Sequence, residues 1–205
     1  MVEPYLRRSP LAGRNLVSRA AEAPAGAGVL LGERAHRTQV DLRGRPDRPG
    51  FLDAAGRALG FPLPVEPNTT AGDGDTTALW LGPDEWLIVA PPDRAAPIMA
   101  GLRAALVGQD IAVTDVSEAR TVILVAGPRA RDLLAKGTPL DIHPRVFGLG
   151  RCAQTVLART GVILHPVDER PVFEVYVLNS YADYLFTWLE RAGAEYGVAI
   201  MGEPS

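Results

Sequence analysis

Segments rich in apolar and β-branched residues alternate along the chain with segments of helical period. Strands are predicted at residues 29–31, 38–42, 76–81, 85–90, 111–116, 121–125, 152–158, 161–164 and 172–178. The first two are expected to pair with each other. The clearest hairpin joins 76–81 to 85–90 through Gly82, Pro83 and Asp84, whose types favour a turn.

Four helices are predicted between these strands. One covers 51–59 and ends at Gly60, another covers 95–107, and a third opens at Gly127-Pro128 and closes at Gly137. The last helix is expected to begin with a capping box formed by Ser180 and Asp183. Apolar residues then recur at helical spacing up to Tyr196, and this stripe either packs in the core or forms the edge of a subunit interface.

The distribution of these elements predicts an α+β fold with mixed, largely antiparallel sheets, because strands and a helix follow each other twice with short connections. Residues 1–27 show no sustained period and contain three prolines, so an N-terminal arm is expected there. Residues 28–205 are predicted to form a single domain with two lobes, about 28–110 and 111–205. Residues 61–75, rich in Pro and Gly, are predicted to be a loop.

Composition excludes several classes of protein. Of the 205 residues, 47% are hydrophobic and 22% charged, which is the balance of a soluble globular protein. No apolar run approaches the roughly 18–20 residues of a membrane helix, and no secretory signal is recognisable, so a cytoplasmic protein without a membrane partner is expected. The net charge of -3 argues against a nucleic-acid partner. The single cysteine, Cys152, excludes an internal disulfide.

No catalytic constellation emerges from the residue pattern. His36, His143 and His165 are far apart and lack metal-ligand spacing, and Cys152 would become a nucleophile only if a histidine reached it in space. The glycine-rich segment 71–75 lacks the lysine and following helix of a phosphate loop and the later glutamate of an EF-hand. Segment 148–150 is expected to be a turn, because no strand-to-helix junction surrounds it. The carboxylate pairs lie beside prolines in turns, at Asp84-Glu85 and Asp168-Glu169. The sequence therefore predicts no catalytic, cofactor-binding or metal-binding residues.

One stretch carries a more specific pattern. A D-x-S turn at Asp115–Ser117 leads to a strand, Gly127-Pro128 starts a helix, and Asp141 lies near the following turn. This order resembles the folate-binding aminomethyltransferase superfamily. Further motifs are similar to one branch of it, the gamma subunits of heterotetrameric sarcosine oxidase: Ser9-Pro10-Leu11, Glu66-Pro67-Asn68-Thr69, and residues 81–87, 140–144, 150–155 and 180–185. The resemblance covers about residues 5–199.

The resemblance implies a complex of alpha, beta, gamma and delta subunits that oxidises sarcosine to glycine. Tetrahydrofolate and O2 would be consumed, and methylenetetrahydrofolate and H2O2 formed. NAD and tetrahydrofolate would lie on the largest subunit, and FAD and FMN on the beta subunit. This chain would resemble half of an aminomethyltransferase, built from duplicated strand–helix units, and would carry no cofactor of its own. Contacts with partners are expected at Trp80, Trp86, Trp188, Arg7 and Arg8.

One local difference separates two readings of this resemblance. Folate-dependent relatives place an acidic pair after Gly-Gly in the region that here reads from Thr160 to Pro166, and His165 and Pro166 occupy the positions of the acids. Carboxylates suit a pterin because they accept hydrogen bonds from its ring N–H and amino groups, whereas proline has no polar side chain and also lacks a backbone N–H donor. A noncatalytic assembly subunit is therefore expected. The alternatives are a stand-alone folate-dependent aminomethyltransferase or folate-binding protein, with Asp168 as the acid, and a scaffold unrelated to sarcosine.

Overall fold

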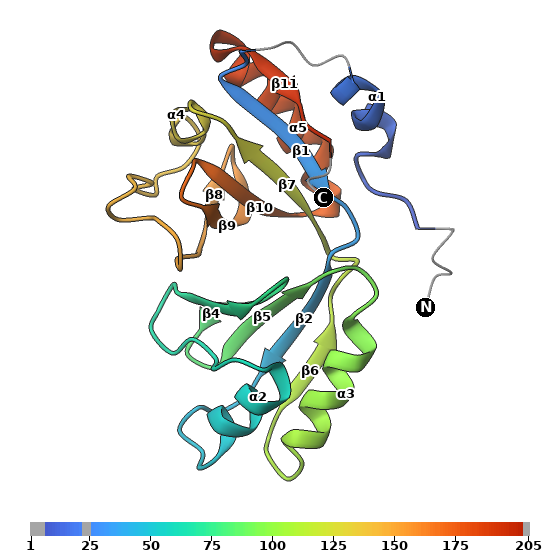
Figure 1. Cartoon of the computed structure of the whole chain (residues 1–205), viewed down its shortest axis with the longest axis vertical. Coiled ribbons are helices and arrows are strands. Elements are labelled where there is room, and N and C mark those ends of the chain that lie inside the picture. The colour runs from blue at the N-terminus through green and yellow to red at the C-terminus, as the bar shows by residue number, and fades with distance from the viewer. Residues whose placement is uncertain (1–6, 22–25, 203–205) are drawn as a thin grey trace. The chain divides into compact units, whose positions relative to one another are not determined.

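The computed structural model describes residues 7–21 and 26–202, which divide into two compact units (Figure 1). Unit 1 contains the described residues within 1–35, 119–149 and 154–205. Unit 2 contains His36–Glu118 and Gly150–Ala153. Neither unit is one continuous segment of chain.

The centre of unit 1 is a six-stranded sheet with the order β11-β1-β7-β10-β9-β8. Its strands are β1 (Val29–Arg34), β7 (Arg120–Ala126), β8 (Ala153–Leu157), β9 (Thr160–Asp168), β10 (Val172–Leu178) and β11 (Val198–Ile200). β11 runs parallel to β1, whereas β1, β7, β10 and β9 pair antiparallel with their neighbours. β7 and β10 are apolar along nearly their whole length, and both are buried.

Helices cover one face of this sheet. α5 (Asn179–Gly193) packs on β7 and β10, and α4 (Ala130–Ala135) packs on α5 and β1. The buried positions of α5 recur every three or four residues and so form one stripe toward the sheet: Ala182, Leu185, Phe186, Leu189 and Gly193. A short 3-10 helix, η3 (Ala194–Tyr196), continues α5 to Gly197, which has a φ of 71°.

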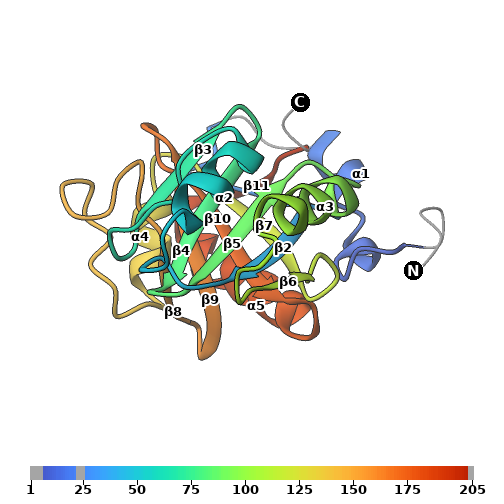
Figure 2. The same cartoon turned by 90° about the horizontal axis from the view of Figure 1, so that it is seen from below.

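Unit 2 is a five-stranded antiparallel sheet with two helices on one face. The strands are β2 (Thr38–Arg43), β3 (Thr70–Asp73), β4 (Thr76–Gly82), β5 (Glu85–Ala90) and β6 (Ala112–Asp115), in the order β3-β4-β5-β2-β6. α2 (Phe51–Leu59) and α3 (Ala95–Ala105) contact each other on the same side of the sheet (Figure 2). Alternate strand residues supply their core because successive side chains point to opposite faces: Val40, Leu42, Ala78, Trp86, Ile88 and Val113.

Several expectations are confirmed. The fold is α+β with largely antiparallel sheets, the β4–β5 hairpin has the predicted partners, and α2 ends at Gly60 with a φ of 87°. α3 is two residues shorter than predicted. The region from 152 to 178 contains the three predicted strands.

Other expectations are wrong. Residues 29–31 and 38–42 do not pair: β1 pairs with β7 and β11 in unit 1, and β2 pairs with β5 and β6 in unit 2. The predicted loop 61–75 contains β3, which pairs with β4 through a turn at Gly74. α5 has no capping box, because Leu178 is its N-cap and no side chain caps it.

The arm and the lobe boundaries also differ from expectation. Within the predicted arm, residues 12–14 form the 3-10 helix η2 (Ala12–Arg14) and residues 16–21 form α1 (Leu16–Ala21). The remaining arm residues 1–6 and 22–25 lie outside the described chain. The units divide near residues 35 and 118 rather than 110, because β6 forms backbone hydrogen bonds with β2 of unit 2. No described helix is long and apolar enough to span a membrane.

Candidate functional site

A buried ionic cluster lies on the sheet of unit 1. Glu174 on β10 is only 4% exposed, and its carboxylate accepts hydrogen bonds from Arg34 Nη1 at 2.5 Å and from the hydroxyl of Tyr176. His165 Nδ1 lies 3.4 Å from the second carboxylate oxygen. The strand register brings these side chains together: Glu174 is opposite His165 on β9, and Tyr176 and Arg34 both flank Val122.

The environment of Glu174 fixes its charge. Burial by itself raises the pKa of the carboxyl group. His165, the Tyr176 hydroxyl and the charge of Arg34 outweigh burial and lower the pKa to about 2, from an ordinary value of 4.5. Glu174 is therefore ionised at neutral pH and cannot donate a proton. Because its oxygens are held by Arg34 and Tyr176, it is also a poor proton acceptor, and the cluster has the character of a structural ion pair.

The sequence contains one indication of this cluster. Glu174 is the single charge inside an otherwise apolar strand, and a buried charge requires a partner. Arg34 at the end of β1 is that partner, although 140 residues separate the two. The sequence analysis considered His165 as a metal ligand, as a histidine that could reach Cys152, and as the replacement of an acidic residue. In the structure His165 faces Glu174, and Pro166 pairs in register with Phe173.

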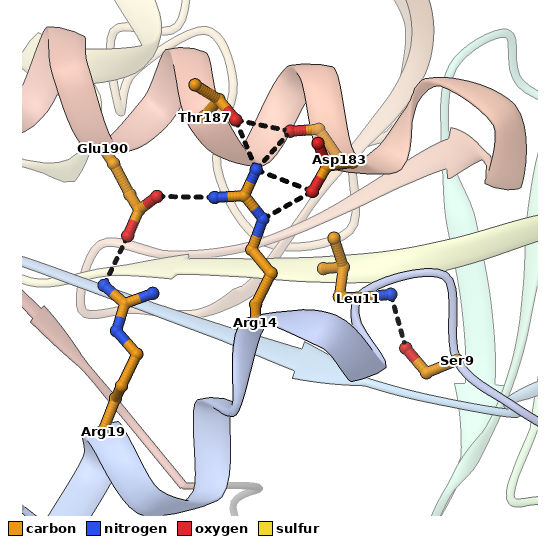
Figure 3. Close-up of polar contacts among 7 residues, drawn as sticks. All are labelled: Ser9, Leu11, Arg14, Arg19, Asp183, Thr187 and Glu190. Atoms are coloured by element: carbon orange, nitrogen blue, oxygen red, sulfur yellow. Dashed lines mark hydrogen bonds and ion pairs between the residues drawn. The ribbon is translucent and has the colours of Figure 1, made fainter.

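The described part of the arm is fixed to α5 by Arg14 (Figure 3). The Arg14 guanidinium, 17% exposed, donates to Asp183 Oδ1 at 2.7 Å, to the Asp183 carbonyl oxygen at 2.9 Å and to Glu190 at 2.8 Å. It also donates to Thr187 Oγ1 and lies 5.3 Å from the centre of the Phe186 ring. Glu190 accepts in addition from Arg19 of α1 at 2.5 Å.

Ser9 and Leu11 hold the arm at a second place. Leu11 is 1% exposed, its N–H donates to Ser9 Oγ, and Ser9 Oγ donates to Glu33 on β1 at 2.5 Å. Glu33 also accepts from Thr121 Oγ1 at 2.6 Å. The Ser9-Pro10-Leu11 motif therefore has a structural role. Asp183, which the sequence suggested as a helix cap, is a partner of Arg14.

The residues of the D-x-S and Gly-Pro pattern also serve the backbone. Asp115 Oδ1 accepts from the N–H and from the hydroxyl of Ser117, and Ser117 Oγ accepts from the N–H of Gln39. Gly127 has a φ of 105°, and a Cβ atom there would lie 2.6 Å from the carbonyl oxygen of Gly28. These residues therefore shape two turns of the backbone.

The cysteine is enclosed in unit 2. Cys152 is 0% exposed, and its thiol lies 3.5 Å from the carbonyl oxygens of Thr69 and Trp80. Burial raises the pKa of this thiol to about 12, although the contact with Trp80 lowers it slightly. At neutral pH the thiolate needed for nucleophilic attack is therefore almost absent.

The other candidate residues remain separate. His143 is exposed, its Nδ1 accepts from the N–H of Arg145, and Asp141 Oδ1 accepts from the N–H of His143. Hydrogen bonds from Arg170 lower the pKa of Asp168 to about 2 at the surface. In the carboxylate pair of the β4–β5 turn, Glu85 is bound to Arg43. Among the described residues, no three His, Cys, Asp or Glu side chains could together hold a metal ion.

The expected partner contacts are only partly accessible. Trp86 is fully buried, with Nε1 donating to the carbonyl oxygen of Pro64 at 2.7 Å, so it cannot reach a partner. Trp80 packs at the edge of the unit 2 core, and Trp188 is partly exposed. On α5 the exposed aromatic residues are Tyr181 and Tyr184, 49% and 48% exposed. One face of α5 is therefore buried in the core, and its other face is exposed.

Comparison with known families gives a direct match. The model of the sarcosine oxidase, gamma subunit family matches residues 43–195. The chain is 38% identical to a sarcosine oxidase subunit gamma of Arthrobacter sp, covering 93% of this chain and 92% of that one. It is 37% identical to the corresponding subunit of Corynebacterium sp. (strain U-96), covering 95% and 93%.

Solved structures agree with this match. The heterotetrameric sarcosine oxidase from Corynebacterium sp. U-96, in complex with pyrrole 2-carboxylate, contains a chain that superimposes with a TM-score of 0.84 at 35% identity, over 98% of this chain and 100% of that chain. The glycine cleavage system aminomethyltransferase T from Bartonella henselae superimposes with a TM-score of 0.66 at 14% identity, over 91% of this chain and 51% of that one. The second likeness shows the aminomethyltransferase fold alone.

Proposed function

Because the chain belongs to the sarcosine oxidase gamma subunit family, we propose that it serves as the gamma subunit of a heterotetrameric sarcosine oxidase and acts there in assembly rather than catalysis. The near-complete coverage of both this chain and its relatives supports the subunit role. The partners are then the alpha, beta and delta subunits, and the complex works in the cytoplasm, without nucleic acid or membrane contact.

The observation that carries the noncatalytic role is the internal pairing of Glu174. A buried carboxylate is the group that acid–base chemistry or pterin recognition would need on this sheet. Here Arg34 and Tyr176 bind its oxygens, and His165 lies 3.4 Å away. Cys152, the only thiol, has a pKa raised to about 12. We infer that the fold is retained in this chain for stabilising the complex.

The chemistry of the complex belongs on this proposal to the other subunits. Sarcosine is oxidised to glycine with tetrahydrofolate and O2, and methylenetetrahydrofolate and H2O2 are formed. FAD, FMN, NAD and tetrahydrofolate lie on the partner subunits. On this proposal, residues 28–205 form one aminomethyltransferase-like domain, and none of these cofactors binds to it.

Co-expression tests the subunit role. The chain is produced with the alpha, beta and delta subunits, with an affinity tag on the beta subunit, and the eluate is analysed by gel filtration. The chain is expected to elute with the complex in equal molar amount, and omission of the chain is expected to lower the yield of intact complex. Recovery of the chain as a free monomer beside a complete and active three-subunit enzyme would contradict the proposal.

The alternative, a folate-binding protein, is tested separately. This alternative is supported by partial matches to aminomethyltransferases. One example is 40% identity over 67 residues to the aminomethyltransferase of Herpetosiphon aurantiacus. The residues of unit 1 do not fit a pterin well, because the Glu174 carboxylate is already bound by Arg34. The purified chain is titrated with tetrahydrofolate in a calorimeter. No saturable binding is expected at micromolar ligand concentrations. Micromolar binding would support the alternative.

A further inference from the structure

The edge strand β11 leaves one row of backbone hydrogen-bonding groups unpaired. β11 lies at one end of the six-stranded sheet, and β1 pairs with only one of its edges. The carbonyl oxygen of Gly197 accepts from β1 at 3.1 Å, and the N–H of Met201 donates to β1 at 2.8 Å. Since successive residues of a strand direct these groups to opposite edges, Val198 and Ile200 direct theirs away from β1. Within the described chain, no other strand pairs with this outer edge.

The outer edge of β11 lacks features that prevent other edge strands from associating. Native sheets protect their edges with charged residues, proline or a covering segment. The edge strands of unit 2, β3 and β6, each contain an aspartate, Asp73 and Asp115. At the other end of the unit 1 sheet, Thr138 bonds to Thr155 of β8 at 3.1 Å. Residues 197–202 contain no charge and no proline, so their own side chains do not oppose pairing.

The helix α1 of the arm lies beside β11 at this end of the sheet (Figure 1). Cα atoms of the two elements approach within 8 Å, and among the described residues no backbone hydrogen bond joins them. α1 has no buried residue. Arg19 of α1 binds Glu190 of α5 at 2.5 Å, and Arg14 binds the same carboxylate at 2.8 Å. α1 is therefore held next to the edge by ionic contacts, which salt weakens.

The outer edge of β11 is complementary to a second copy of itself. Val198 and Ile200 each offer one N–H and one C=O, and they flank Ala199 symmetrically. When two such edges run antiparallel, Val198 of one copy lies opposite Ile200 of the other, and each pair exchanges two hydrogen bonds. Both residues are β-branched, a type favoured in cross-strand pairs. A two-fold axis at Ala199 therefore satisfies every outward backbone group of the two strands.

We propose that the free edge of β11 binds the β11 edge of a second copy of this chain, and that α1 covers this edge until the arm is released. Release of the arm joins two six-stranded sheets through their β11 strands. The arm thus keeps the free chain monomeric. This inference does not rest on the proposed function, because it concerns the chain outside any complex.

Two double variants of the full chain test whether the arm covers the edge. Arg14→Ala with Arg19→Ala, the arm variant, removes the ionic contacts with α5. Arg57→Ala with Arg94→Ala is the matched control, because both of these arginines are exposed in unit 2. In gel filtration the unaltered chain and the control are expected to elute as monomers, and the arm variant as a concentration-dependent dimer. Raised hydrogen exchange of residues 16–21 confirms that the arm is released.

A disulfide tests the register of the pairing. The two Ala199 residues would form a non-hydrogen-bonded pair with Cα atoms about 4.5 Å apart, a distance that a disulfide spans. Under mild oxidation, Ala199→Cys should cross-link about tenfold faster in the arm variant than in the control variant. Gly202→Cys is exposed and away from the axis, so it reports random collisions, and its rate should change less than about twofold. Cys152 does not compete, because it is buried.

A proline in β11 tests whether backbone pairing causes the association. Val198→Pro removes an outward N–H that β1 does not use. Added to the arm variant, it is expected to return cross-linking of Ala199→Cys to within about twofold of the control rate. Cross-linking at the control rate despite a released arm would overturn the inference. Faster cross-linking that Val198→Pro leaves unchanged would overturn it as well.

Salt provides a second way to release the arm, which decides the matter if the arm variant does not fold. In the chain altered only by Ala199→Cys, 1 M salt screens the contacts of Arg14 and Arg19 and should accelerate cross-linking. Gly202→Cys in the same salt is the control. Equal acceleration at both positions, or none at Ala199→Cys, would contradict the pairing of β11 strands.

Discussion

Glu174 shows how a single residue can be placed by partners that are distant in sequence. Its carboxylate is buried in the unit 1 sheet, and its charge is tolerated because His165, Tyr176 and Arg34 surround it. The lowered pKa of Glu174 has a consequence for stability. Since the folded state holds the ionised form, protonation must weaken folding.

Glu174→Gln is expected to destabilise the chain by about 3 kcal/mol at pH 7, because Arg34 loses its buried counter-charge. The pKa of Glu174 is lowered in the folded state, so its contribution is complete above the ordinary value of 4.5 and is lost as the pH falls toward about 2. Urea unfolding at several pH values between 7 and 3 measures this. The variant should lose less stability on acidification than the unaltered chain, and the exposed Glu169→Gln control should behave like the unaltered chain. Equal pH dependence in all three would refute the assignment.

Cys152 gives a second prediction for a single residue. With a pKa raised to about 12 by burial, its thiolate population at pH 8 is about a thousandfold below that of a thiol with the ordinary value of 9.0. Alkylation by iodoacetamide, followed by mass spectrometry, should therefore be at least a hundredfold slower in the folded chain than in urea. Rapid labelling of the folded chain would reveal an accessible, activated thiol.

At the scale of elements, the junction between β7 and α4 depends on a glycine. Gly127 has a φ of 105° and lies against the carbonyl oxygen of Gly28, next to the start of β1. A side chain there would strain the backbone and separate β7 from that segment. The Gly-Pro motif therefore specifies how a strand, a turn and a helix meet.

Gly127→Ala is expected to destabilise the chain by about 2–4 kcal/mol, through left-handed backbone strain and the steric contact with Gly28. Gly101→Ala is the matched control, because Gly101 lies within α3 and a Cβ atom there meets nothing within 4 Å. This control should stabilise the chain by about 0.5–1 kcal/mol, since alanine favours helix. Thermal and urea unfolding measure the stability of both variants. Stability changes of the same sign in Gly127→Ala and Gly101→Ala would contradict the role given to backbone strain at Gly127.

The arm gives a prediction at the same scale. α1 has no buried residue, so its attachment depends on the ionic contacts of Arg14 and Arg19 with α5 and on the anchoring of Leu11. Arg14→Ala should raise amide hydrogen exchange in residues 16–21 about tenfold, corresponding to roughly 1–2 kcal/mol of lost contacts. In the unaltered chain, 1 M salt should produce a smaller change of the same sign because it screens exposed charges. Arg57→Ala serves as the control. Unchanged hydrogen exchange of residues 16–21 in Arg14→Ala would show that other contacts attach the arm to α5.

At the scale of the whole molecule, each unit is assembled from separate segments. β6 joins β2, β1 joins β7, and Gly150–Ala153 returns to unit 2, where Arg151 pairs with Thr69. Such long-range pairing fixes the fold only when the whole chain is present. Within these units, Glu174, Asp115 and Cys152 all take part in internal contacts.

The assembled enzyme provides the corresponding prediction. Cys152→Ala is expected to leave the turnover of the complex within twofold of the unaltered enzyme, because the thiol is buried and protonated. Steady-state sarcosine oxidation by the purified complex, normalised to intact complex by gel filtration, measures this. A loss beyond tenfold with assembly intact would assign chemistry to this chain.

The sequence by itself determined the local elements and the family. Helices such as α2 and the β4–β5 hairpin follow from residues adjacent in the chain, where period and turn residues such as Gly60 are sufficient. The D-x-S and Gly-Pro motifs identified the superfamily because their turns require these residues.

Only the tertiary structure decided which strands pair and where charged residues find their partners. Nothing local distinguishes β7 from β2 as the neighbour of β1, because strand pairing depends on the free energy of the whole sheet. The pairings of Glu174 with Arg34 and of Arg14 with Asp183 span 140 and 169 residues. Sequence patterns indicate that a buried charge needs a partner, and the folded chain alone determines which residue supplies it.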